Sequence, residues 1–357
     1  MTEENNTSIF ETKKKTITGT QTCGCADNCC ETPAIQTTTS KIIFADRLDH
    51  LLARLGWNRL NHSVEPGLYR LGDPDAESPV FASANYTLSF DALRSSLAGI
   101  DAWILVLDTK GINVWCAAGK GTFGTDELVH RIESTGLAGI VSHRKIIVPQ
   151  LGAPGVFWPE VVQRTKFIVE YGPVRANDLP EYLKTHTATP DMRCVKFSLR
   201  DRLVLTPVEF MHFALPTVAI SAALWFLAGP FAALAAVSAV LSGTVLFPLL
   251  LPVIPTRDFS TKGMILGVIV SLPFAYVFGT TPGLPMWAGA LSAVAALLLI
   301  PAVIAYLALN FTGCSTFTSR MGVKKEIFSY VKVMAGMAAV GVISGIILGV
   351  SKIMGVI

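Results

Sequence analysis

Residues 102–125, which read AWILVLDTKGINVWCAAGKGTFGT, set the pattern of the amino-terminal part of the chain. The segment opens with an apolar run, 102–107, of the length typical of a buried strand. It closes at Thr125, a good helix N-cap that is followed by two acidic residues suited to the positive start of a helix. Between strand and helix lie four glycines, a tryptophan and a single cysteine. Open α/β folds place their ligands at such a junction.

Strand and helix signals alternate on both sides of this segment. We expect further extended pieces at 112–115, 145–148 and 167–170, and helices at 41–62, 91–98, 125–135, 159–164 and 177–184. Alternating βα units of this length predict an α/β, Rossmann-like domain over residues 41–205.

The composition divides the chain into two unlike parts. The chain has 357 residues, of which 51% are hydrophobic and 15% charged, and only nine of its 29 basic and 26 acidic residues follow position 209. The first 209 residues carry a formal charge of −2 and the rest +5. These numbers exclude a wholly soluble protein, a disordered chain, a coiled coil and a small disulfide scaffold, and they indicate no nucleic-acid-binding surface.

The carboxyl-terminal part, 206–357, contains five uncharged apolar stretches at 210–229, 231–253, 263–281, 285–309 and 333–351. A helix needs about 20 residues to cross about 30 Å of hydrocarbon, so each stretch is long enough to span a membrane. The absence of charge disfavours the alternative of buried helices in a soluble core. We therefore predict an all-α transmembrane bundle of five helices.

Basic residues lie before the first stretch, between the second and third, and between the fourth and fifth, whereas the alternate loops are uncharged. The positive-inside rule then predicts a multi-pass protein of the cytoplasmic (inner) membrane, with the α/β domain in the cytoplasm and the carboxyl terminus outside. The first 40 residues are polar and show no signal peptide. His212 is the sole ionisable residue within the stretches, so we expect an anchor rather than a translocation path.

Residues 1–40 predict a flexible tail, because they contain almost no aliphatic side chains. Its four cysteines, Cys23, Cys25, Cys29 and Cys30, form a C-x-C-x3-C-C pattern. Clustered thiols in a cytoplasmic segment favour metal binding over disulfides, although this spacing matches neither a ferredoxin cluster nor a common zinc site. Thiols that the protein can do without are the alternative. Cys194 and Cys314 are interpreted as structural.

The glycine-rich segment 111–125 matches no common nucleotide motif. A phosphate-binding loop needs a glycine five residues before Gly119 and a Ser or Thr after Lys120, and the sequence has neither. What remains is Cys116 followed by small residues, which allow a broad flat ligand to approach the backbone closely. A cysteine thiolate is a soft ligand for a transition metal, and an inert buried cysteine is the alternative.

The segment resembles the cap-helix motif N-(V/I)-W-C-A-(A/G)-G-K of the corrinoid protein that methylates mercury in anaerobic microbes, the HgcA family. The matching residues are Asn113, Val114, Trp115, Cys116, Ala117, Ala118, Gly119 and Lys120. Residues 84–86 and 150–156 look like the loops around the corrin in the related large subunit of the corrinoid iron–sulfur protein of the acetyl-CoA pathway. The resemblance covers about residues 60–190.

The resemblance implies a methyltransferase that binds cobalamin base-off, with Cys116 as the lower axial ligand of cobalt. The cofactor-binding residues that it implies are Asn113, Val114, Trp115, Cys116, Ala117, Ala118, Gly119, Lys120, Gln150, Gly152 and Gly155. The activity implied is transfer of a methyl group from methyl-Co(III) cobalamin to Hg(II), which forms methylmercury. A small ferredoxin-like [4Fe-4S] protein is the implied reductant and a methyl-folate route the implied methyl donor. Capture of mercury would then be one function for the tail cysteines, and thiols that the protein can do without stay the alternative.

Two other functions stay open on the sequence. One is a corrinoid methyl carrier of one-carbon metabolism, like that of the acetyl-CoA pathway, although the membrane stretches count against it. The other is a membrane-bound ligand sensor or transporter component without a corrinoid.

Overall fold

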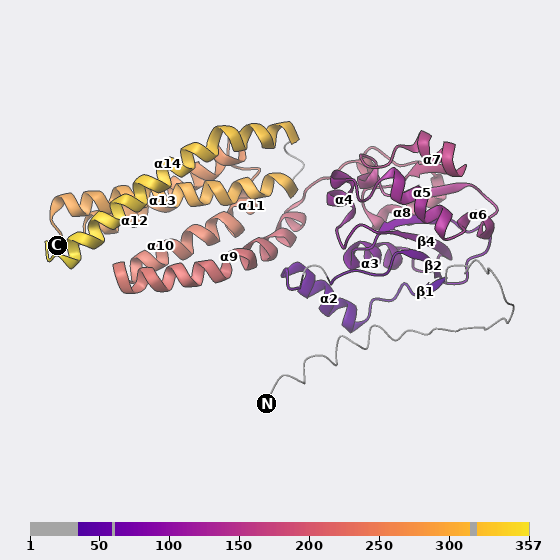
Figure 1. Ribbon diagram of the computed structural model, residues 1–357, viewed down its shortest axis with the longest axis horizontal. Coiled ribbons are helices and arrows are strands. Elements are labelled where there is room, and N and C mark those ends of the chain that lie inside the picture. Colours follow the sequence, from indigo (N-terminus) through magenta and orange to yellow (C-terminus); the bar gives the residue numbers. More distant parts are fainter. Residues whose placement is uncertain (1–34, 59–60, 315–319, 357) are drawn as a thin grey trace, which may run out of the picture.

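The computed structural model describes residues 35–58, 61–314 and 320–356. Figure 1 shows an α/β domain followed by a bundle of long helices, arranged end to end along the longest axis of the molecule. The α/β domain precedes residue 199, where the first long helix begins. A mixed α/β domain followed by long apolar helices agrees with the coarse architecture that the composition predicts.

Within the described residues, six strands form one sheet in the order β1-β2-β4-β3-β5-β6. Strands β3, β4, β5 and β6 run parallel, β2 runs antiparallel to β4, and β1 pairs parallel with β2, so the sheet is mixed. The strands are β1 (Gln36–Thr38), β2 (Gly67–Leu71), β3 (Val80–Ala84), β4 (Ala102–Leu107), β5 (Lys145–Val148) and β6 (Ile168–Tyr171).

Helices cover both faces of this sheet. Side chains of α3 (Thr87–Ser96) and α8 (Leu179–Thr185) pack on one face, and those of α4 (Val114–Lys120), α5 (Thr125–Ser134) and α7 (Trp158–Thr165) pack on the other. A short helix, α6 (Leu137–Ile140), follows α5. Every residue of β4 is buried, and its side chains alternate between the two cores. This burial on both faces explains why 102–107 is uniformly apolar.

The expected strands at 102–107, 145–148 and 167–170 are present, the last shifted by one residue. The expected extended piece at 112–115 is wrong, because α4 begins at Val114. The Asn113 side chain accepts a hydrogen bond from the Cys116 N–H and so starts a helix there. Three strands were not expected: β1 lies within the stretch assigned to the tail, and β2 and β3 precede the quoted segment.

The expected helices differ from the observed ones mainly at their ends. The helix expected at 125–135 is α5, but its N-cap is Gly124, and the Thr125 hydroxyl instead accepts a hydrogen bond of 2.8 Å from the Phe157 N–H. The helix expected at 41–62 is shorter: α2 (Phe44–Arg54) ends before Gly56, whose φ of +72° breaks the helix. The other three are α3, α7 and α8, displaced by one to four residues.

Polar contacts attach α2 to the domain. The buried Arg94 guanidinium on α3 contacts Asp46 at 2.7 Å and Asp91 at 2.6 Å, and His50 lies 2.7 Å from the other oxygen of Asp91. Arg94 also donates to the carbonyl oxygens of Thr39 and Lys41 at 2.6 and 2.8 Å. One buried cation therefore joins α3, α2 and the strand-to-helix connection before α2.

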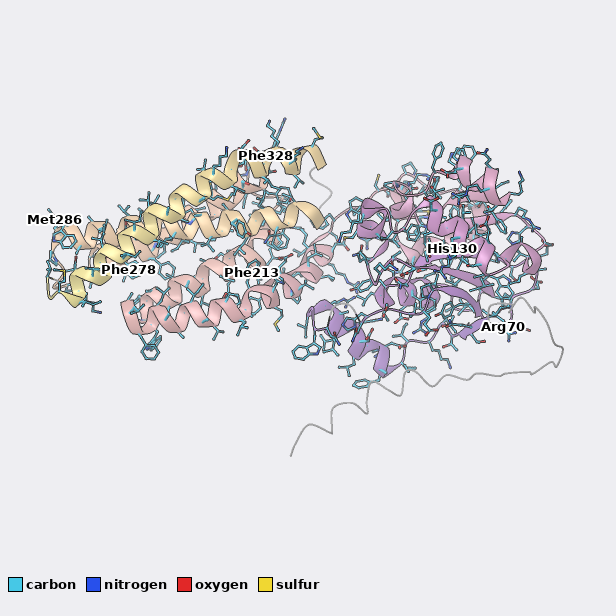
Figure 2. All side chains as sticks on the ribbon, in the orientation of Figure 1. Arg70, His130, Phe213, Phe278, Met286 and Phe328 are labelled. Carbon is cyan, nitrogen blue, oxygen red and sulfur yellow. The ribbon has the colours of Figure 1, made fainter. Side chains whose placement is uncertain are left out.

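Five helices are long and apolar enough to cross a membrane, as the composition predicts: Leu199–Ala228, Pro230–Leu250, Phe259–Gly279, Met286–Gly313 and Met321–Ile353. They comprise α9 (Leu199–Ala228), α10 (Pro230–Leu241) with a π-helical turn and α11 (Phe247–Leu250), α12 (Phe259–Gly279), α13 (Met286–Asn310) and α14 (Arg320–Ile353). Figure 2 shows Met286 and Phe328 at opposite ends of the bundle, where they are 90% and 65% exposed. The bundle thus presents apolar side chains outward along its length.

Small residues bring the bundle helices together. A Cβ on Gly263 or Gly267 of α12 would lie 2.6 Å from the Ala305 Cα or 2.3 Å from the Pro301 Cα of α13. This small-xxx-small spacing allows close backbone contact, which is the usual basis of helix association in lipid.

Charged side chains satisfy helix ends at the end of the bundle nearer the α/β domain. Arg202 donates to the carbonyls of Pro248 and Leu249, and Lys262 to those of Leu251 and Ile254. Glu326 accepts from the N–H and hydroxyl of Ser260 in the first turn of α12, both at 3.1 Å. These charges fall inside the observed helices because the helices extend beyond the uncharged stretches.

We expect Arg94→Ala to lower the free energy of unfolding of the α/β domain by about 3–5 kcal/mol, because it leaves two carboxylates near α2 without their buried cation. Chemical denaturation followed by tryptophan fluorescence measures this. The control is Arg164→Ala, which removes ion pairs from a surface arginine that is 39% exposed. Equal destabilisation by both substitutions would contradict the assigned role of Arg94.

Candidate functional site

The candidate site lies at one edge of the sheet. Strands β3, β4 and β5 are parallel, so their carboxyl ends meet at this edge and are followed there by Asn85, Asp108 and Gln150. The chain leaves β3 through α3 on one face and leaves β4 through α4 and α5 on the other, and β5 then pairs with β3. Such a reversal of strand order opens a crevice at the strand ends, where open α/β sheets bind ligands.

Asn85 holds the connection between β4 and α4 in place. Its buried side-chain oxygen accepts hydrogen bonds from the Thr109 N–H at 3.1 Å, the Thr109 hydroxyl at 2.8 Å and the Gly111 N–H at 3.0 Å. The Thr109 hydroxyl oxygen also lies 2.7 Å from the Ile112 carbonyl oxygen. One amide oxygen thus fixes the turn that delivers the chain to α4.

The helix α4 is only seven residues long and is closed at both ends. The Asn113 side-chain oxygen accepts a hydrogen bond of 2.9 Å from the Cys116 N–H at its start. At its end Gly121 adopts a φ of +85° and its N–H donates to the Ala117 carbonyl. An isolated helix of this length is unstable in water, so these caps and the packing below it hold it in place.

The two sides of α4 differ in burial. Val114, Ala117 and Ala118 are buried in the core beneath the helix. The outward side consists of Trp115, which is 40% exposed, half-buried Cys116, and exposed Gly119 and Lys120. The cysteine therefore lies at the surface of the helix beside a glycine that has no side chain to obstruct a ligand.

Glycines let the loop after β5 pack directly against α4. A Cβ on Gly155 would lie 2.1 Å from the Phe123 carbonyl oxygen and 3.1 Å from the Ala118 Cα, and one on Gly152 would lie 2.5 Å from the ring of buried Phe123. The distances of 2.1 and 2.5 Å are shorter than real Cβ contacts, so a side chain at either position would force its neighbours to shift.

Hydrogen bonds from outside this loop hold it at its two ends. The Tyr171 hydroxyl donates to the Val156 carbonyl at 2.7 Å, and burial raises the pKa of Tyr171, so the hydroxyl keeps its proton. The Gln150 side-chain oxygen accepts from Arg193 at 2.8 Å. The amide of Gln150 is therefore directed toward Arg193 rather than toward α4.

Charged groups surround the turn at the end of β4. Burial raises the pKa of the Asp108 carboxyl, but hydrogen bonds from the Lys110 ammonium and N–H outweigh it and hold that pKa below its usual range. Glu127 on α5 accepts from the Asp108 N–H at 2.8 Å and pairs with Arg131 at 2.7 Å. The turn is thus tied to α5 as well as to Asn85.

The structure brings most of the sequence-predicted residues together. Residues 113–120 form α4 with its N-cap, and Gly152 and Gly155 lie against it. Cys23, Cys25, Cys29 and Cys30 lie outside the described residues. Sequence reasoning missed the positioning roles of Asn85, Glu127 and Tyr171. The resemblance did single out residues 84–86 as a loop near the corrin, but the place of Asn85 at the end of a strand could not be used because β3 was not predicted.

A metal site built from protein side chains alone needs about three or more ligands. Within 35–58, 61–314 and 320–356, no three His, Cys, Asp or Glu side chains lie close enough together to hold a metal ion. Cys116 therefore belongs to no such cluster within the described residues.

A family model described as CO dehydrogenase/acetyl-CoA synthase delta subunit matches residues 58–179. Curated proteins named acetyl-CoA decarbonylase/synthase complex subunit gamma are similar in sequence. That of Methanopyrus kandleri is 37% identical over 123 residues, which is 34% of this chain and 26% of the relative. That of Methanocaldococcus jannaschii is 39% identical over 97 residues, or 27% and 20% of the two chains. Subunit gamma 2 of Methanosarcina mazei is 31% identical over 126 residues, or 34% and 26%.

The family match contains both α4 and the loop at 150–156, so the similarity covers the candidate site. The chain spans about a quarter of the length of the curated relatives it matches. The family model is named for a delta subunit and the relatives for gamma subunits, so the similarity is to one region of differently named subunits.

We expect Gly155→Ala to destabilise the domain by about 1–3 kcal/mol, because the new methyl group would overlap backbone atoms of Phe123 and Ala118. Hydrogen exchange should also show faster exchange of the α4 amides. Gly139→Ala on α6 is the matched control, since its Cβ would meet no atom within 4 Å. Unchanged α4 protection in Gly155→Ala would show that this contact does not position the helix.

Proposed function

We propose that the chain is a membrane-anchored, corrinoid-dependent methyltransferase that transfers a methyl group to Hg(II). The observation that carries the proposal is the presentation of half-buried Cys116 on the outer side of a short, doubly capped helix, α4, at the carboxyl edge of the sheet. The eight residues 113–120 that resemble the cap-helix motif of the HgcA family form this helix and its N-cap. The family match over 58–179 supports a corrinoid protein more broadly.

The outward side of α4 suits a broad, flat ligand. Gly119 adds no side chain, while Trp115 and Lys120 offer an indole ring and an ammonium group on the same exposed side. The residues proposed to hold cobalamin are Asn113 to Lys120 directly, with Gly152 and Gly155 supporting the helix from below. When bound base-off, cobalamin would supply the cobalt centre that carries the methyl group.

The proposed role of Cys116 is to hold that cobalt, which its sulfur would ligate. A thiolate sulfur is a soft donor, and electron donation from it favours release of a methyl group to a soft electrophile such as Hg(II). Asn113 acts through Cys116, because its hydrogen bond to the Cys116 N–H orients the first turn of α4. Asn85 positions the turn before Asn113 in the same way.

The membrane helices supply the proposed location. We propose the cytoplasmic membrane, the α/β domain in the cytoplasm and the carboxyl terminus outside, since the basic loops join the helices at the end nearer the α/β domain. Figure 1 draws α4 at the end of the domain nearer the bundle.

The proposed division remains a tail at 1–40, an α/β domain at 41–205 and a membrane domain at 206–357, although 36–38 pair with the sheet. The partners proposed are a ferredoxin-like [4Fe-4S] reductant and a methyl-folate donor route.

A second candidate function is a corrinoid methyl carrier in one-carbon metabolism. The names of the relatives favour it, because those proteins are subunits of acetyl-CoA decarbonylase/synthase complexes. The long apolar helices and the partial coverage of those relatives count against it.

The proposal predicts that Cys116→Ala abolishes mercury methylation by the cobalamin-loaded protein, because the alanine side chain cannot bind cobalt. The variant should still fold and bind cobalamin, with a visible absorption spectrum shifted from that of the parent. Cys194→Ala, which changes an exposed cysteine elsewhere in the domain, should keep both the parent spectrum and the activity.

The outcomes separate the candidate functions. Normal methylation by Cys116→Ala would overturn the ligand assignment. Cobalamin binding by the parent without mercury methylation, but with methyl exchange with methyl-folate, would favour the one-carbon carrier. A parent protein that remains colourless after cobalamin loading would favour a ligand sensor.

Mercury capture by the tail is tested separately by replacing Cys23, Cys25, Cys29 and Cys30 with serine in one variant. Substitution is preferable to deletion of residues 1–40, because Gln36–Thr38 pair with β2 and the Thr39 carbonyl accepts from Arg94. We expect slower methylation at limiting Hg(II) and an unchanged rate at saturation. An unchanged rate at limiting Hg(II) would remove the capture role.

A further inference from the structure

The helix α2 is amphipathic in the reverse of the usual sense. At 3.6 residues per turn, Asp46, Asp49 and His50 lie on one side, and Phe44, Leu48 and Leu51 on the opposite side. In a soluble domain the apolar side of such a helix normally faces the core. Here the polar side faces the domain.

Polar contacts fix this orientation. Asp46 pairs with Arg94 at 2.7 Å, Asp49 with His62 at 2.9 Å, and His50 with Asp91 at 2.7 Å. Asp46, Asp91, Arg94 and His62 are all buried. Rotating α2 to bury its apolar side would therefore break three buried or partly buried polar contacts, so the outward apolar side is a fixed feature of the fold.

The outward side exposes large apolar side chains together. Phe44 is 81% exposed and Leu51 54%, and Ile43 and Leu48 are also exposed. Trp57, in the turn after α2, is 65% exposed. Contiguous exposed apolar groups of this kind mark a surface that contacts something else.

The exposed charges around this surface are basic. Lys41, Arg47 and Arg54 are exposed, whereas the two acids of α2 are engaged with Arg94 and His62. An apolar stripe flanked by cations is the pattern of a helix that lies in the interface of a membrane with anionic lipids. Tryptophan is likewise enriched at the level of the lipid headgroups.

The position of α2 agrees with such a location. It packs against α9, and Figure 1 shows it beside the amino-terminal end of that helix. With 30 residues, α9 is about 45 Å long, about 15 Å more than the hydrocarbon layer. Its charged residues, Arg200, Asp201, Arg202 and Glu209, all fall in its first eleven positions. That part of α9 would therefore cross the headgroup layer, next to α2.

We propose that α2 is an in-plane membrane-surface helix, with Phe44, Leu48, Leu51 and Trp57 inserted among the lipid headgroups and acyl-chain ends. The occupant of this apolar face is the bilayer that the long helices cross, so the inference rests on the proposed membrane anchoring. With α9, α2 gives the α/β domain a second attachment to the membrane and fixes its tilt over the surface.

Tryptophan quenching in the full-length protein tests this. The parent, Trp57→Phe, Trp158→Phe and Trp225→Phe are reconstituted in vesicles of phosphatidylethanolamine and phosphatidylglycerol, with and without lipid that carries a nitroxide on its headgroup. The difference between the parent and each variant isolates one tryptophan. Trp158 is an exposed tryptophan on α7, which Figure 1 places away from the bundle, and Trp225 lies near the carboxyl end of α9.

We expect the nitroxide lipid to quench the Trp57 signal severalfold more strongly than the Trp158 signal, and aqueous acrylamide to show the reverse order. Phe44→Glu and Leu48→Glu are then introduced together into both the parent and the Trp57→Phe variant. They should reduce the lipid quenching of Trp57 to the level of Trp158. Both residues are exposed, so their replacement leaves the core unchanged.

Three results would overturn the proposal. Equal quenching of Trp57 and Trp158 by nitroxide lipid would place α2 in water. A Trp57 signal shielded from acrylamide but insensitive to nitroxide lipid would mean that a protein, such as a second copy of this chain, covers the face. Failure to quench Trp225 would refute membrane anchoring itself, whereas quenching of Trp225 without Trp57 would refute only the inference about α2.

Discussion

The candidate site depends on the contact between α4 and the glycine loop after β5. A seven-residue helix has too few internal hydrogen bonds to persist alone, so its place is set by what surrounds it. Asn85 fixes the turn that precedes it, Asn113 and Gly121 close its ends, and Gly155 allows the loop to approach Ala118 without a side chain between them. Each of these contacts keeps half-buried Cys116 on the outer side of the helix, beside exposed Gly119.

Tertiary contacts also hold buried cations in both parts of the chain. Arg94 fixes α2 through Asp46, and Arg202 and Lys262 satisfy the carbonyls at the end of α11 and in the turn after it. These cations are buried, and their hydrogen bonds offset part of the cost of removing the charge from water. Between the two parts, Arg175 of the α/β domain donates to Asp201 of α9 at 2.7 Å, and α2 packs against α9.

Much of the fold could be predicted because its signals are local. The run 102–107 is apolar throughout because β4 is buried on both faces, and the long apolar helices follow from the absence of charge over about 20 residues at a time. The predictions that were wrong concern segments whose structure depends on specific hydrogen bonds rather than on the pattern of apolar residues. Residues 112–115 have strand-like side chains, but one Asn113 hydrogen bond converts them to a helix start. Strands β1, β2 and β3 are short, and their pairing partners lie far away in the sequence.

By itself, the sequence determined that the chain has a charged α/β part and an apolar helical part, and that Cys116 lies among small residues in a motif between a strand and a helix. Those properties depend on side chains that are neighbours along the chain. Tertiary structure alone decided that Asn85 and Gly155 support the motif from other strand ends and that α2 directs its apolar side outward. Neither could be read from periodicity, because a helical pattern defines two sides but only the partners Arg94, Asp91 and His62 determine which of them faces the domain.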